Sequence, residues 1–359
     1  GFFKDADDEE QAFTAVLTKG VWSAATPVVI DDALQAADKN AKFQHVSCGS
    51  DTSCTAVGHF KNSNNGFSLM SQKYANGTWA NPEVIPIEDI GQAPASQATP
   101  TALVCMTATD CTIAGYFWDG GNQDPLVVDM VDGMWQAGKR LSFADGLSGS
   151  DREADMQSLA CSSAGNCYAG GSFWSADGTY DAFIVSSEDR VWGAANRVSY
   201  AADTERTPAN ASDELRAISC HLGGACTAVG YFKNNSGNSQ GFILPLAADT
   251  PTAIPMPTID EAAPTFLVDI SCSDETCIAV GSAGGAAVVM PWADDTWGTP
   301  TAVPIPSDIQ SQSSPSSFAA TATCVSTSCL VSGRFQNTAD SSDAFVTTYD
   351  GETWSDPER

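Results

Sequence analysis

The chain has 359 residues, with 44 acidic and 16 basic side chains and a formal net charge of −28. This excess of acid excludes nucleic acid as a natural partner, because binding to a phosphate backbone uses Lys and Arg to displace counterions. Hydrophobic residues make up 43% and charged residues 17%, a composition that excludes an acidic disordered chain and predicts a folded protein with its acid on the surface.

No run of eighteen or more apolar residues occurs, so we expect no membrane insertion. The first residues, Gly1-Phe2-Phe3-Lys4, lead directly into an acidic segment and do not have the pattern of a signal peptide. We therefore expect a mature or trimmed chain.

Twelve cysteines occur as six pairs, four with five intervening residues and two with four. The pairs are Cys48 and Cys54, Cys105 and Cys111, Cys161 and Cys167, Cys220 and Cys226, Cys272 and Cys277, and Cys324 and Cys329. Zinc sites use CxxC-type pairs near a second pair or near histidines, which this spacing does not match. The sequence predicts six local disulfides formed in an oxidising compartment. We expect an extracellular protein, secreted or on a cell surface, with the periplasm as the alternative.

The cysteine pairs mark a repeat of 52 to 59 residues, and each unit contains four short β-rich segments, named strands a to d here. Repeat units begin near residues 43, 100, 156, 215, 267 and 319, and residues 1–40 form a half-unit. Strand a ends at the first cysteine and strand b begins at the second. Facing residues on antiparallel strands lie about 4.5–5.5 Å apart, so each cysteine pair is expected to join an a–b hairpin.

Strands c and d also carry repeated residues. The turn between them contains an Asn-Gly or Asp-Gly pair in several units, as at Asn76-Gly77, which favours a two-residue hairpin turn. Strand d opens with a tryptophan in most units, at Trp22, Trp79, Trp135, Trp192, Trp297 and Trp354. We expect these tryptophans to pack between adjacent sheets rather than to bind a ligand.

Repeats of this length with four short strands are typical of β-propellers. The segment Thr348-Tyr349-Asp350-Gly351-Glu352-Thr353-Trp354 resembles the Asp-box or BNR-like repeats of sialidases and of the photosystem II assembly-factor family. The units are also similar to the Cys-bearing propeller repeats of secreted bacterial proteins. This resemblance covers nearly the whole chain. It implies an all-β propeller, a single domain over residues 1–359, with four-stranded antiparallel blades that each carry a hairpin disulfide.

The N-terminus begins within a repeat, because Gly1-Phe2-Phe3-Lys4 matches the end of strand b in Gly58-His59-Phe60-Lys61. Six cysteine hairpins and seven c–d segments predict seven blades, with an incomplete N-terminal blade. Six blades with an N-terminal appendage is the alternative. We expect the missing a–b hairpin to lie upstream in the full gene product. An unpaired blade edge would favour self-association.

No catalytic residue is predicted. The resemblance to sialidases implies a site with several arginines, a tyrosine nucleophile and acidic partners, but no arginine occurs in the first 139 residues. His59 occupies a variable position of strand b and His221 lies in a cysteine turn, so neither indicates a nucleophile–His–acid triad. Glycan hydrolysis by paired carboxylates in a central funnel stays open as an alternative.

The loops between strands b and c are rich in carboxylates and amides, which are the ligands that calcium prefers. The candidate calcium ligands are Asp5, Asp7, Asp119, Asn122, Asp124, Asp177, Asp181, Asp340 and Asp343. Plain hairpin loops rich in turn-forming residues are the alternative. Trp118 and Trp174 lie beside two of these loops, where they could stack on a sugar or pack on the rim.

The sequence therefore predicts a non-catalytic extracellular module for binding, adhesion or surface assembly. Its partner would be a protein or glycan on a cell surface or in an extracellular assembly. A secreted glycan-acting hydrolase and a filament subunit that self-assembles through the open half-blade are the alternatives. No cofactor other than calcium is expected.

Overall fold

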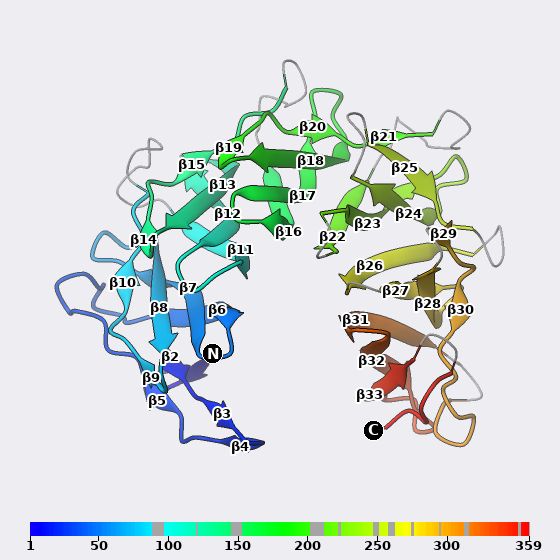
Figure 1. Cartoon of the computed structure of the whole chain (residues 1–359), viewed down its shortest axis with the longest axis horizontal. Helices are drawn as coiled ribbons and strands as arrows, with labels where there is room; N and C mark the ends of the chain where they lie inside the picture. Colours follow the sequence, from blue (N-terminus) through cyan, green and yellow to red (C-terminus); the bar gives the residue numbers. More distant parts are fainter. Residues whose placement is uncertain are drawn as a thin grey trace. The chain divides into compact units, whose positions relative to one another are not determined.

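The structure is a computed structural model of the chain, and β-strands are its regular secondary structure throughout the residues that it describes. These residues are 1–87, 97–119, 121–144, 153–201, 212–221, 224–246, 251–257, 263–273, 276–293, 296–311, 316–350 and 353–358. Within them, no helix could cross a membrane. The chain divides into two compact units, one formed by Gly1–Ala169 with Val185–Ala195 and the other by Gly170–Ile184 with Asn196–Arg359 (Figure 1). The single domain over residues 1–359 stays a prediction.

Three antiparallel sheets lie entirely within the first unit, and the sheets are numbered here in chain order. Sheet 1 consists of β1 (Phe2–Lys4), β2 (Glu10–Thr14) and β5 (Thr26–Pro27), next to a small hairpin of β3 (Leu17–Thr18) and β4 (Val21–Trp22). Sheet 2 consists of β6 (Ala41–Ser50), β7 (Ser53–Lys61), β8 (Phe67–Ala75), β9 (Thr78–Trp79) and β10 (Glu83–Val84). Sheet 3 consists of β11 (Ala98–Cys105), β12 (Cys111–Asp119), β13 (Asn122–Val131), β14 (Met134–Trp135) and β15 (Lys139–Arg140).

The division between the units passes through sheet 4, which consists of β16 (Ala154–Ser163), β17 (Asn166–Trp174), β18 (Tyr180–Glu188), β19 (Val191–Trp192) and β20 (Asn196–Arg197). In the second unit, sheet 5 consists of β22 (Glu214–Cys220), β23 (Cys226–Lys233), β24 (Ser239–Pro245) and β25 (Thr252–Pro255), with β21 (Ser199–Tyr200) parallel to β25. Sheet 6 consists of β26 (Thr265–Cys272), β27 (Cys277–Ala283), β28 (Ala286–Ala293), β29 (Thr296–Trp297) and β30 (Thr301–Ala302). Sheet 7 consists of β31 (Ser317–Val325), β32 (Ser328–Gln336) and β33 (Ser342–Tyr349).

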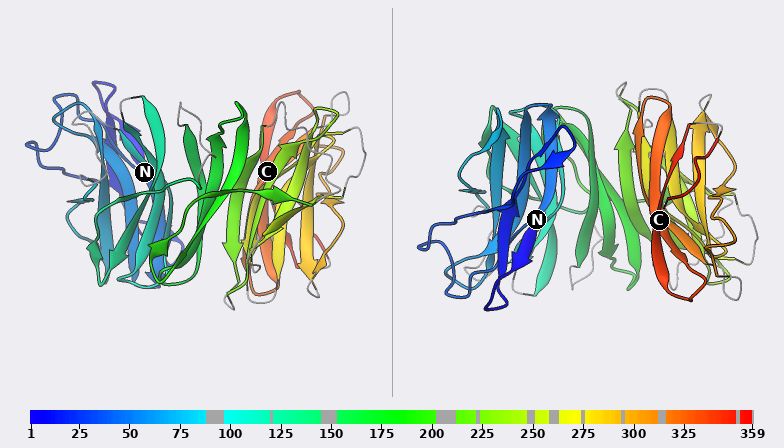
Figure 2. Two further views of the ribbon diagram at one scale, coloured as in Figure 1. Left: turned by 90° about the horizontal axis from the view of Figure 1, so that it is seen from above. Right: turned by 90° about the horizontal axis from the view of Figure 1, so that it is seen from below.

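The strands follow the predicted order a, b, c and d in sheets 2, 3, 5 and 6, where strand d is one strand or two short pieces. The first strands of these sheets begin within two residues of the predicted repeat starts, for example at Ala41 and Ala98. Within each unit, consecutive sheets pack face to face and their a strands are neighbours, as β6 is to β11 and β26 is to β31 (Figures 1 and 2).

All six predicted disulfides are present, and no described cysteine is free. Cys105 lies directly opposite Cys111 in the a–b ladder, and Cys220 lies opposite Cys226. The Cα atoms of the six pairs are 3.8–4.0 Å apart. Each disulfide therefore closes one tight a–b hairpin, and chain entropy alone makes such a closure worth about 2 kcal/mol.

A glycine in strand b lets strand a come unusually close. A Cβ atom on this glycine would lie 1.8–2.3 Å from a carbonyl oxygen of strand a. The five glycines with this contact are Gly58, Gly115, Gly230, Gly281 and Gly333. In each case strand a is bulged at this level, as between Leu215 and Ala217. Only glycine has the space that this bulged ladder leaves.

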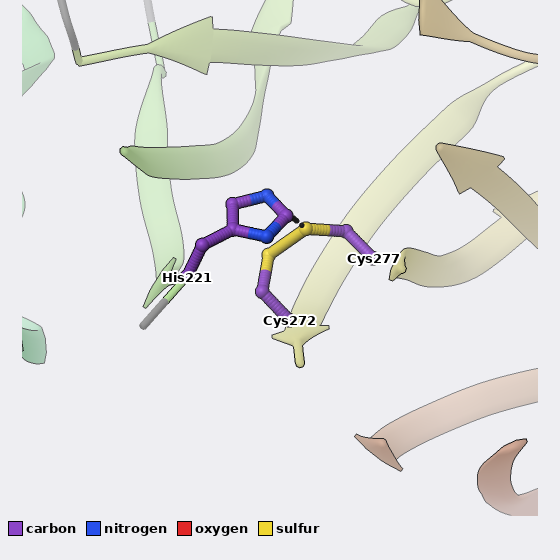
Figure 3. Close-up of side chains that lie close together, drawn as sticks. All are labelled: His221, Cys272 and Cys277. Carbon is purple, nitrogen blue, oxygen red and sulfur yellow. Dashed lines mark hydrogen bonds between the residues drawn. A yellow bond between two sulfur atoms is a disulfide. The ribbon is translucent and has the colours of Figure 1, made fainter. Parts of the chain in front are cut away.

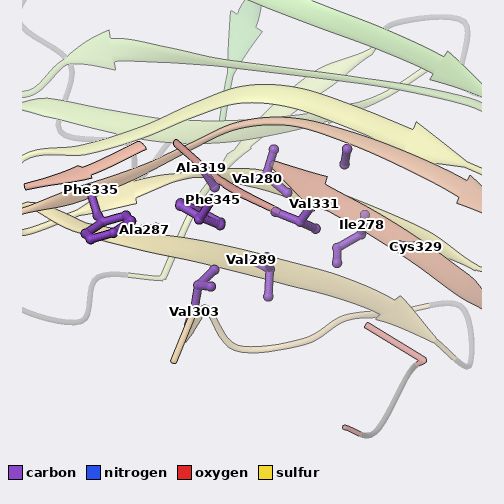
Figure 4. Close-up of a cluster of buried hydrophobic side chains, with 11 residues drawn as sticks. Ile278, Val280, Ala287, Val289, Val303, Ala319, Cys329, Val331, Phe335 and Phe345 are labelled. Carbon is purple, nitrogen blue, oxygen red and sulfur yellow. The ribbon is translucent and has the colours of Figure 1, made fainter. Parts of the chain in front are cut away.

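Apolar side chains fill the layers between neighbouring sheets. In the second unit, Val280 and Val289 of sheet 6 belong to the same buried cluster as Val331 and Phe345 of sheet 7 (Figure 4). Strand b is covered on both sides, and all seven residues of β27 are buried. Its small and β-branched side chains, in Ile-Ala-Val-Gly, suit a strand that lies between two sheets.

The repeated tryptophans behave as predicted in four sheets, because Trp79, Trp135, Trp297 and Trp354 pack against buried clusters. Trp135 also donates a hydrogen bond from Nε1 to Oγ of Ser71 in the preceding sheet, at 2.7 Å. The prediction is wrong for Trp22, whose exposed fraction is 67%. Sheet 1 has no sheet before it in the first unit, so Trp22 has no corresponding surface to cover.

The N-terminal residues do form the end of a strand b, as predicted. Phe2 pairs with Ala12 and Lys4 with Glu10, so β1 lies beside β2 as β7 lies beside β8. Sheet 1 thus has strands b, c and d, but among the described residues no strand a.

We expect Gly230→Ala to lower the free energy of unfolding by about 3 kcal/mol, because its Cβ would lie 2.0 Å from the Glu214 carbonyl oxygen and force strand a away. Chemical denaturation measures this loss. Gly193→Ala is the matched control, because its Cβ would meet nothing closer than 3.6 Å. An equal effect of the two substitutions would contradict the role assigned to the strand b glycine.

Candidate functional site

Four of the b–c loops, those of sheets 1, 2, 5 and 7, share one local structure, in which the first loop side chain accepts two backbone hydrogen bonds. Oδ1 of Asn234 accepts from the N–H groups of Ser236 and Asn238, at 3.1 and 3.0 Å. Asn62 and Asn337 make the same pair of bonds in their loops. Oδ1 of Asp5 does so with Asp7 and Glu9, both at 3.0 Å. These contacts are those of an Asx turn, which supports the plain-hairpin interpretation of these loops.

Two of the predicted calcium ligands are buried carboxylates paired with arginines of the same sheet. The side chains of Asp124 and Asp181 are 4% and 1% exposed. Asp124 pairs with Arg140, and Asp181 lies 3.1 Å from Arg197 Nη2. The guanidinium group supplies the positive charge that a buried carboxylate requires. The sequence contains a signal for both pairs that we did not use, since each arginine follows its aspartate by 16 residues.

The other predicted ligands are spread over separate loops. Asp177 is exposed and pairs with Arg197, at 3.0 Å, while Asp7 is also exposed. Asp119 and Asn122 are opposite residues at the β12–β13 turn. Asp340, with a φ of 57°, accepts a hydrogen bond from Ser311 at 2.6 Å. Asp343 lies opposite Phe335 in the b–c ladder and is half-buried. Calcium binding by these loops stays a prediction.

Within the described residues, one group of three side chains has ligand atoms close enough for a metal ion, namely His221, Cys272 and Cys277 (Figure 3). His221 Nε2 lies 2.9 Å from Cys277 Sγ, and its Nδ1 lies 2.8 Å from the Ser273 carbonyl oxygen. The two sulfur atoms form a disulfide and are not thiolate ligands. The imidazole therefore packs the hairpin of sheet 5 onto the disulfide of sheet 6, a contact that the sequence did not predict.

The described tyrosine with the most strongly perturbed pKa does not have the properties of a nucleophile. Burial raises the pKa of Tyr231, and its hydrogen bond to Glu214 raises it further. Glu214 also pairs with Arg216, at 2.9 Å. The phenol is thus held protonated at neutral pH.

Histidine chemistry is disfavoured at His59. Burial, with the positive charge of Lys42, lowers the pKa of His59 to about 4. The ring packs against Phe67 at a centroid distance of 4.8 Å, and its Nδ1 is buried without a hydrogen-bond partner. It is a neutral, packed side chain at neutral pH.

A polar hollow of about 380 Å³ lies at the b–c end of sheets 6 and 7. It is lined by Ser282, Ser317, Phe318, Arg334, Gln336 and Asp340, among others. The guanidinium carbon of Arg334 lies 5.8 Å from the centre of the Phe318 ring. We call this feature the Arg334 hollow.

Arg334 differs from the other described arginines. Arg140, Arg190, Arg197 and Arg216 each pair with a carboxylate. In the described part of the chain, the exposed side chain of Arg334 has no carboxylate within ion-pair distance and instead lies over an aromatic ring. This arginine is therefore available to a ligand.

The two tryptophans singled out in the sequence are half-buried at the ends of their b strands. Trp174 packs edge-on against Tyr180, with ring centroids 4.9 Å apart. Trp118 lies opposite Gln123 at the corresponding place in sheet 3. Neither lines the Arg334 hollow, and their binding of a ligand stays a prediction.

No protein-family profile matches the chain, and no curated protein matches it in sequence. Solved structures do match. An ulvan lyase of polysaccharide lyase family 25, bound to a -[GlcA(1-4)Rha3S]- saccharide, is 8% identical, with 98% of this chain and 90% of the lyase chain covered and a TM-score of 0.52. The lyase without the saccharide gives 9% identity, the same coverage and a TM-score of 0.53. YCF48 bound to D1 peptide is 12% identical, with 92% and 86% covered and a TM-score of 0.46.

These structural neighbours are β-propellers. At such low identity the likeness concerns the fold alone. Together with the repeated four-stranded antiparallel sheets, it confirms the predicted all-β propeller. The number of blades, seven or six, stays a prediction.

Arg197 should contribute strongly to the stability of the fold, because it pairs with the buried carboxylate of Asp181. We expect Arg197→Met to lower the free energy of unfolding by about 3 kcal/mol, because Asp181 would keep a buried, uncompensated charge. Asp177→Asn should change it by less than about 1 kcal/mol, because that carboxylate is 71% exposed and its pair with Arg197 is screened by water. Equal losses, measured by denaturation, would contradict this division of roles.

The buried His59 predicts a pH dependence. Its native pKa of about 4 lies below the usual 6.5, so the unfolded chain binds more protons between these values. The stability contributed by the neutral ring is complete above pH 6.5 and is lost as the pH falls toward 4, by up to about 3 kcal/mol. His59→Tyr, with the residue found at positions 116 and 231 of the repeat, should remove this part of the pH dependence. Melting temperatures of the original chain and of His59→Tyr that fall in parallel between pH 6.5 and 4 would contradict this prediction.

Proposed function

We propose that this chain is a non-catalytic extracellular binding module that takes a saccharide into the Arg334 hollow. The observation that carries the proposal is Arg334 itself. It is an exposed arginine, free of carboxylates among the described residues, in a chain with a net charge of −28. In such a chain, an arginine that pairs with nothing else is well suited to pair with a ligand.

The lining of the hollow has the chemistry of saccharide recognition. The guanidinium group of Arg334 offers a rigid set of N–H donors to hydroxyl or carboxylate oxygens. The amide of Gln336 already bonds with Ser316 and with the Asp340 carbonyl oxygen, at 3.3 and 3.4 Å, and so holds that side of the hollow in place, while the hydroxyls of Ser282 and Ser317 add further polar groups. Phe318 supplies an apolar surface for the C–H face of a sugar ring. A concave site with a few polar groups beside an aromatic ring is typical of small-ligand binding.

Binding is favoured over cleavage by the carboxylates that are present. Glycoside hydrolysis uses a pair of carboxyl groups on either side of the scissile bond. Among the described residues that line the hollow, Asp340 is the acidic one, and its Oδ1 already accepts a hydrogen bond from Ser311. A single carboxylate, already engaged by Ser311 of the connector before β31, supports a binding role.

The disulfides support the extracellular setting. Six disulfides persist in an oxidising compartment and are rare in the cytosol. The partner would then be a glycan on a cell surface or in an extracellular assembly, and adhesion would be the biological outcome.

Titration calorimetry with oligosaccharides tests the proposal. The first ligand should be a glucuronic-acid-containing oligosaccharide, which is the class named for the ulvan lyase, followed by a neutral one. We expect saturable binding that Arg334→Gln weakens at least about tenfold, since hydrogen bonds to a charged group are worth about 1.5–3 kcal/mol. Arg216→Gln is the matched control, because Arg216 is engaged by Glu214 in the same unit.

Two results would contradict the proposal. One is saccharide binding that Arg334→Gln leaves unchanged, which would place the site elsewhere. The other is release of shorter products during incubation, which would favour the hydrolase alternative.

A further inference from the structure

One of the six disulfides lies against an imidazole ring. His221 Nε2 is 2.9 Å from Cys277 Sγ, and Figure 3 shows the ring beside the disulfide that Cys277 forms with Cys272. In sheets 3 and 4 the second cysteine has a weaker polar neighbour. There a threonine hydroxyl of the preceding sheet lies 3.8 Å from the sulfur of Cys111 and 3.9 Å from that of Cys167. Among the polar side chains of the described residues, the imidazole thus makes the closest contact with a disulfide sulfur.

The hydrogen bond at the other ring nitrogen decides which nitrogen faces the sulfur. Nδ1 of His221 lies 2.8 Å from the Ser273 carbonyl oxygen, and because a carbonyl oxygen accepts, Nδ1 carries the hydrogen. In the neutral ring Nε2 then presents its lone pair to Cys277 Sγ, and in the protonated ring it presents an N–H. Trp292 holds the ring from the side, with the ring centroids 4.8 Å apart. The imidazole can therefore accept a proton from a Cys277 thiol, or donate to a Cys277 thiolate, without moving.

The two sulfur atoms of this disulfide differ in their access to solvent. Cys277 is 1% exposed, whereas Cys272 is half-buried. A thiolate from solution therefore meets Cys272 first, and Cys277, beside the imidazole, becomes the leaving group. In thiol–disulfide exchange a better stabilised thiolate leaves faster, and a neighbouring imidazolium stabilises a thiolate. The imidazole is thus placed at the sulfur where it assists the exchange.

The backbone of this hairpin is held by contacts that do not depend on the disulfide. The Cys272 N–H donates to Ser219 Oγ of the preceding sheet at 3.0 Å. The Ser273 N–H donates to the Thr276 carbonyl oxygen at 2.8 Å, and Ile270 is buried, with 4% of its surface exposed. After reduction the two thiols should therefore stay opposite each other, so that the exchange can run in both directions.

We propose that the disulfide between Cys272 and Cys277 is a site of thiol–disulfide exchange with a small dithiol, assisted by His221. A thiolate of the dithiol forms a bond to Cys272 Sγ as the bond between the two cysteines breaks, and the electron pair of that bond passes to Cys277 Sγ. His221 Nε2 shares a proton with this sulfur. The second thiolate of the dithiol then displaces Cys272 and closes the new disulfide. The dithiol has given up two electrons and two protons, and the protein holds them as two cysteine thiols.

Limited reduction of the full chain with dithiothreitol tests the proposal. New thiols are alkylated at intervals at neutral pH, and the modified cysteines are identified by peptide mass spectrometry. The disulfide of Cys324 and Cys329 is the matched reference within the same sample. It has the same spacing, a half-buried first cysteine and a second cysteine that is 1% exposed. The preceding hairpin, however, carries Ser273 at the position that His221 has for Cys277.

Two substitutions separate assistance by the imidazole from its packing. His221→Phe keeps a ring against Trp292 but has no nitrogen. His221→Asn keeps an amide that can donate to the Ser273 carbonyl oxygen but has no group that reaches the sulfur. We expect both to slow the opening of the Cys272–Cys277 bond at least about tenfold relative to the reference, because the leaving sulfur loses a charge-assisted hydrogen bond. An imidazole that merely packs would give the opposite sign, since its loss would loosen the contact and leave the opening unchanged or faster.

Thermal melting checks that the variants fold, and the rate at Cys220 and Cys226, in the hairpin that carries His221, shows whether that hairpin stays closed. An unchanged or faster opening of the Cys272–Cys277 bond, in either variant that melts as the original chain does, would overturn the proposal. So would a Cys272–Cys277 bond that stays intact in the original chain until the chain unfolds. None of these residues lines the Arg334 hollow, so the outcome is independent of saccharide binding.

Discussion

The fold depends on one close contact, in which strand a places a carbonyl oxygen where a side chain on strand b would stand. A Cβ atom at Gly281 would lie 1.9 Å from the Phe266 oxygen, so the two strands can approach only at a glycine. The disulfide fixes the same pair of strands a few residues away, at Cys272 and Cys277. Together these two constraints set the register of the hairpin, and a one-residue slip would turn every apolar side chain to the wrong face. The core between sheets follows from this register.

Strand a also makes the polar contacts that join one sheet to the next. The hydroxyl of Ser271 accepts from the Cys324 N–H at 2.9 Å, and the Asp269 carboxylate accepts from the Ala322 N–H at 2.9 Å. Burial raises the pKa of Asp269, while the hydrogen bonds from Ala322 and Thr321 act in the opposite direction. These polar contacts join inner strands whose apolar faces also pack together. A sheet without strand a loses its own inner layer and also leaves the next sheet uncovered, which explains why Phe3 and Val46 are both exposed.

The sequence was sufficient for those features that are local and repeated. The hairpin disulfides, the strand starts and the assignment of residues 1–4 to strand b all follow from spacing within one unit. The sequence was insufficient where the burial or the pairing of a side chain depends on a neighbouring strand or sheet. Trp22 has the same local pattern as Trp79, but its burial requires a preceding sheet. The pairs of Asp124 with Arg140 and Asp181 with Arg197 join strands c and d, and the loop sequence that suggests calcium ligands does not show the arginine on the neighbouring strand. The Arg334 hollow is formed by two sheets, and no single motif indicates it.

The net charge of the chain says less about ligand binding than the local pairing of its charged groups. A net charge of −28 spread over an exposed surface is screened within about 8 Å at physiological ionic strength, so it selects no particular partner. Local pairing is more informative. Arg140 and Arg197 neutralise buried carboxylates, and Arg190 and Arg216 pair with Asp110 and Glu214. Because these four are already engaged, their guanidinium groups have little left to offer a ligand. Among the described arginines, Arg334 is the one without a carboxylate partner, and it lies at a hollow and against an aromatic ring, which is why we propose it as the guanidinium group that meets an oxygen-rich ligand.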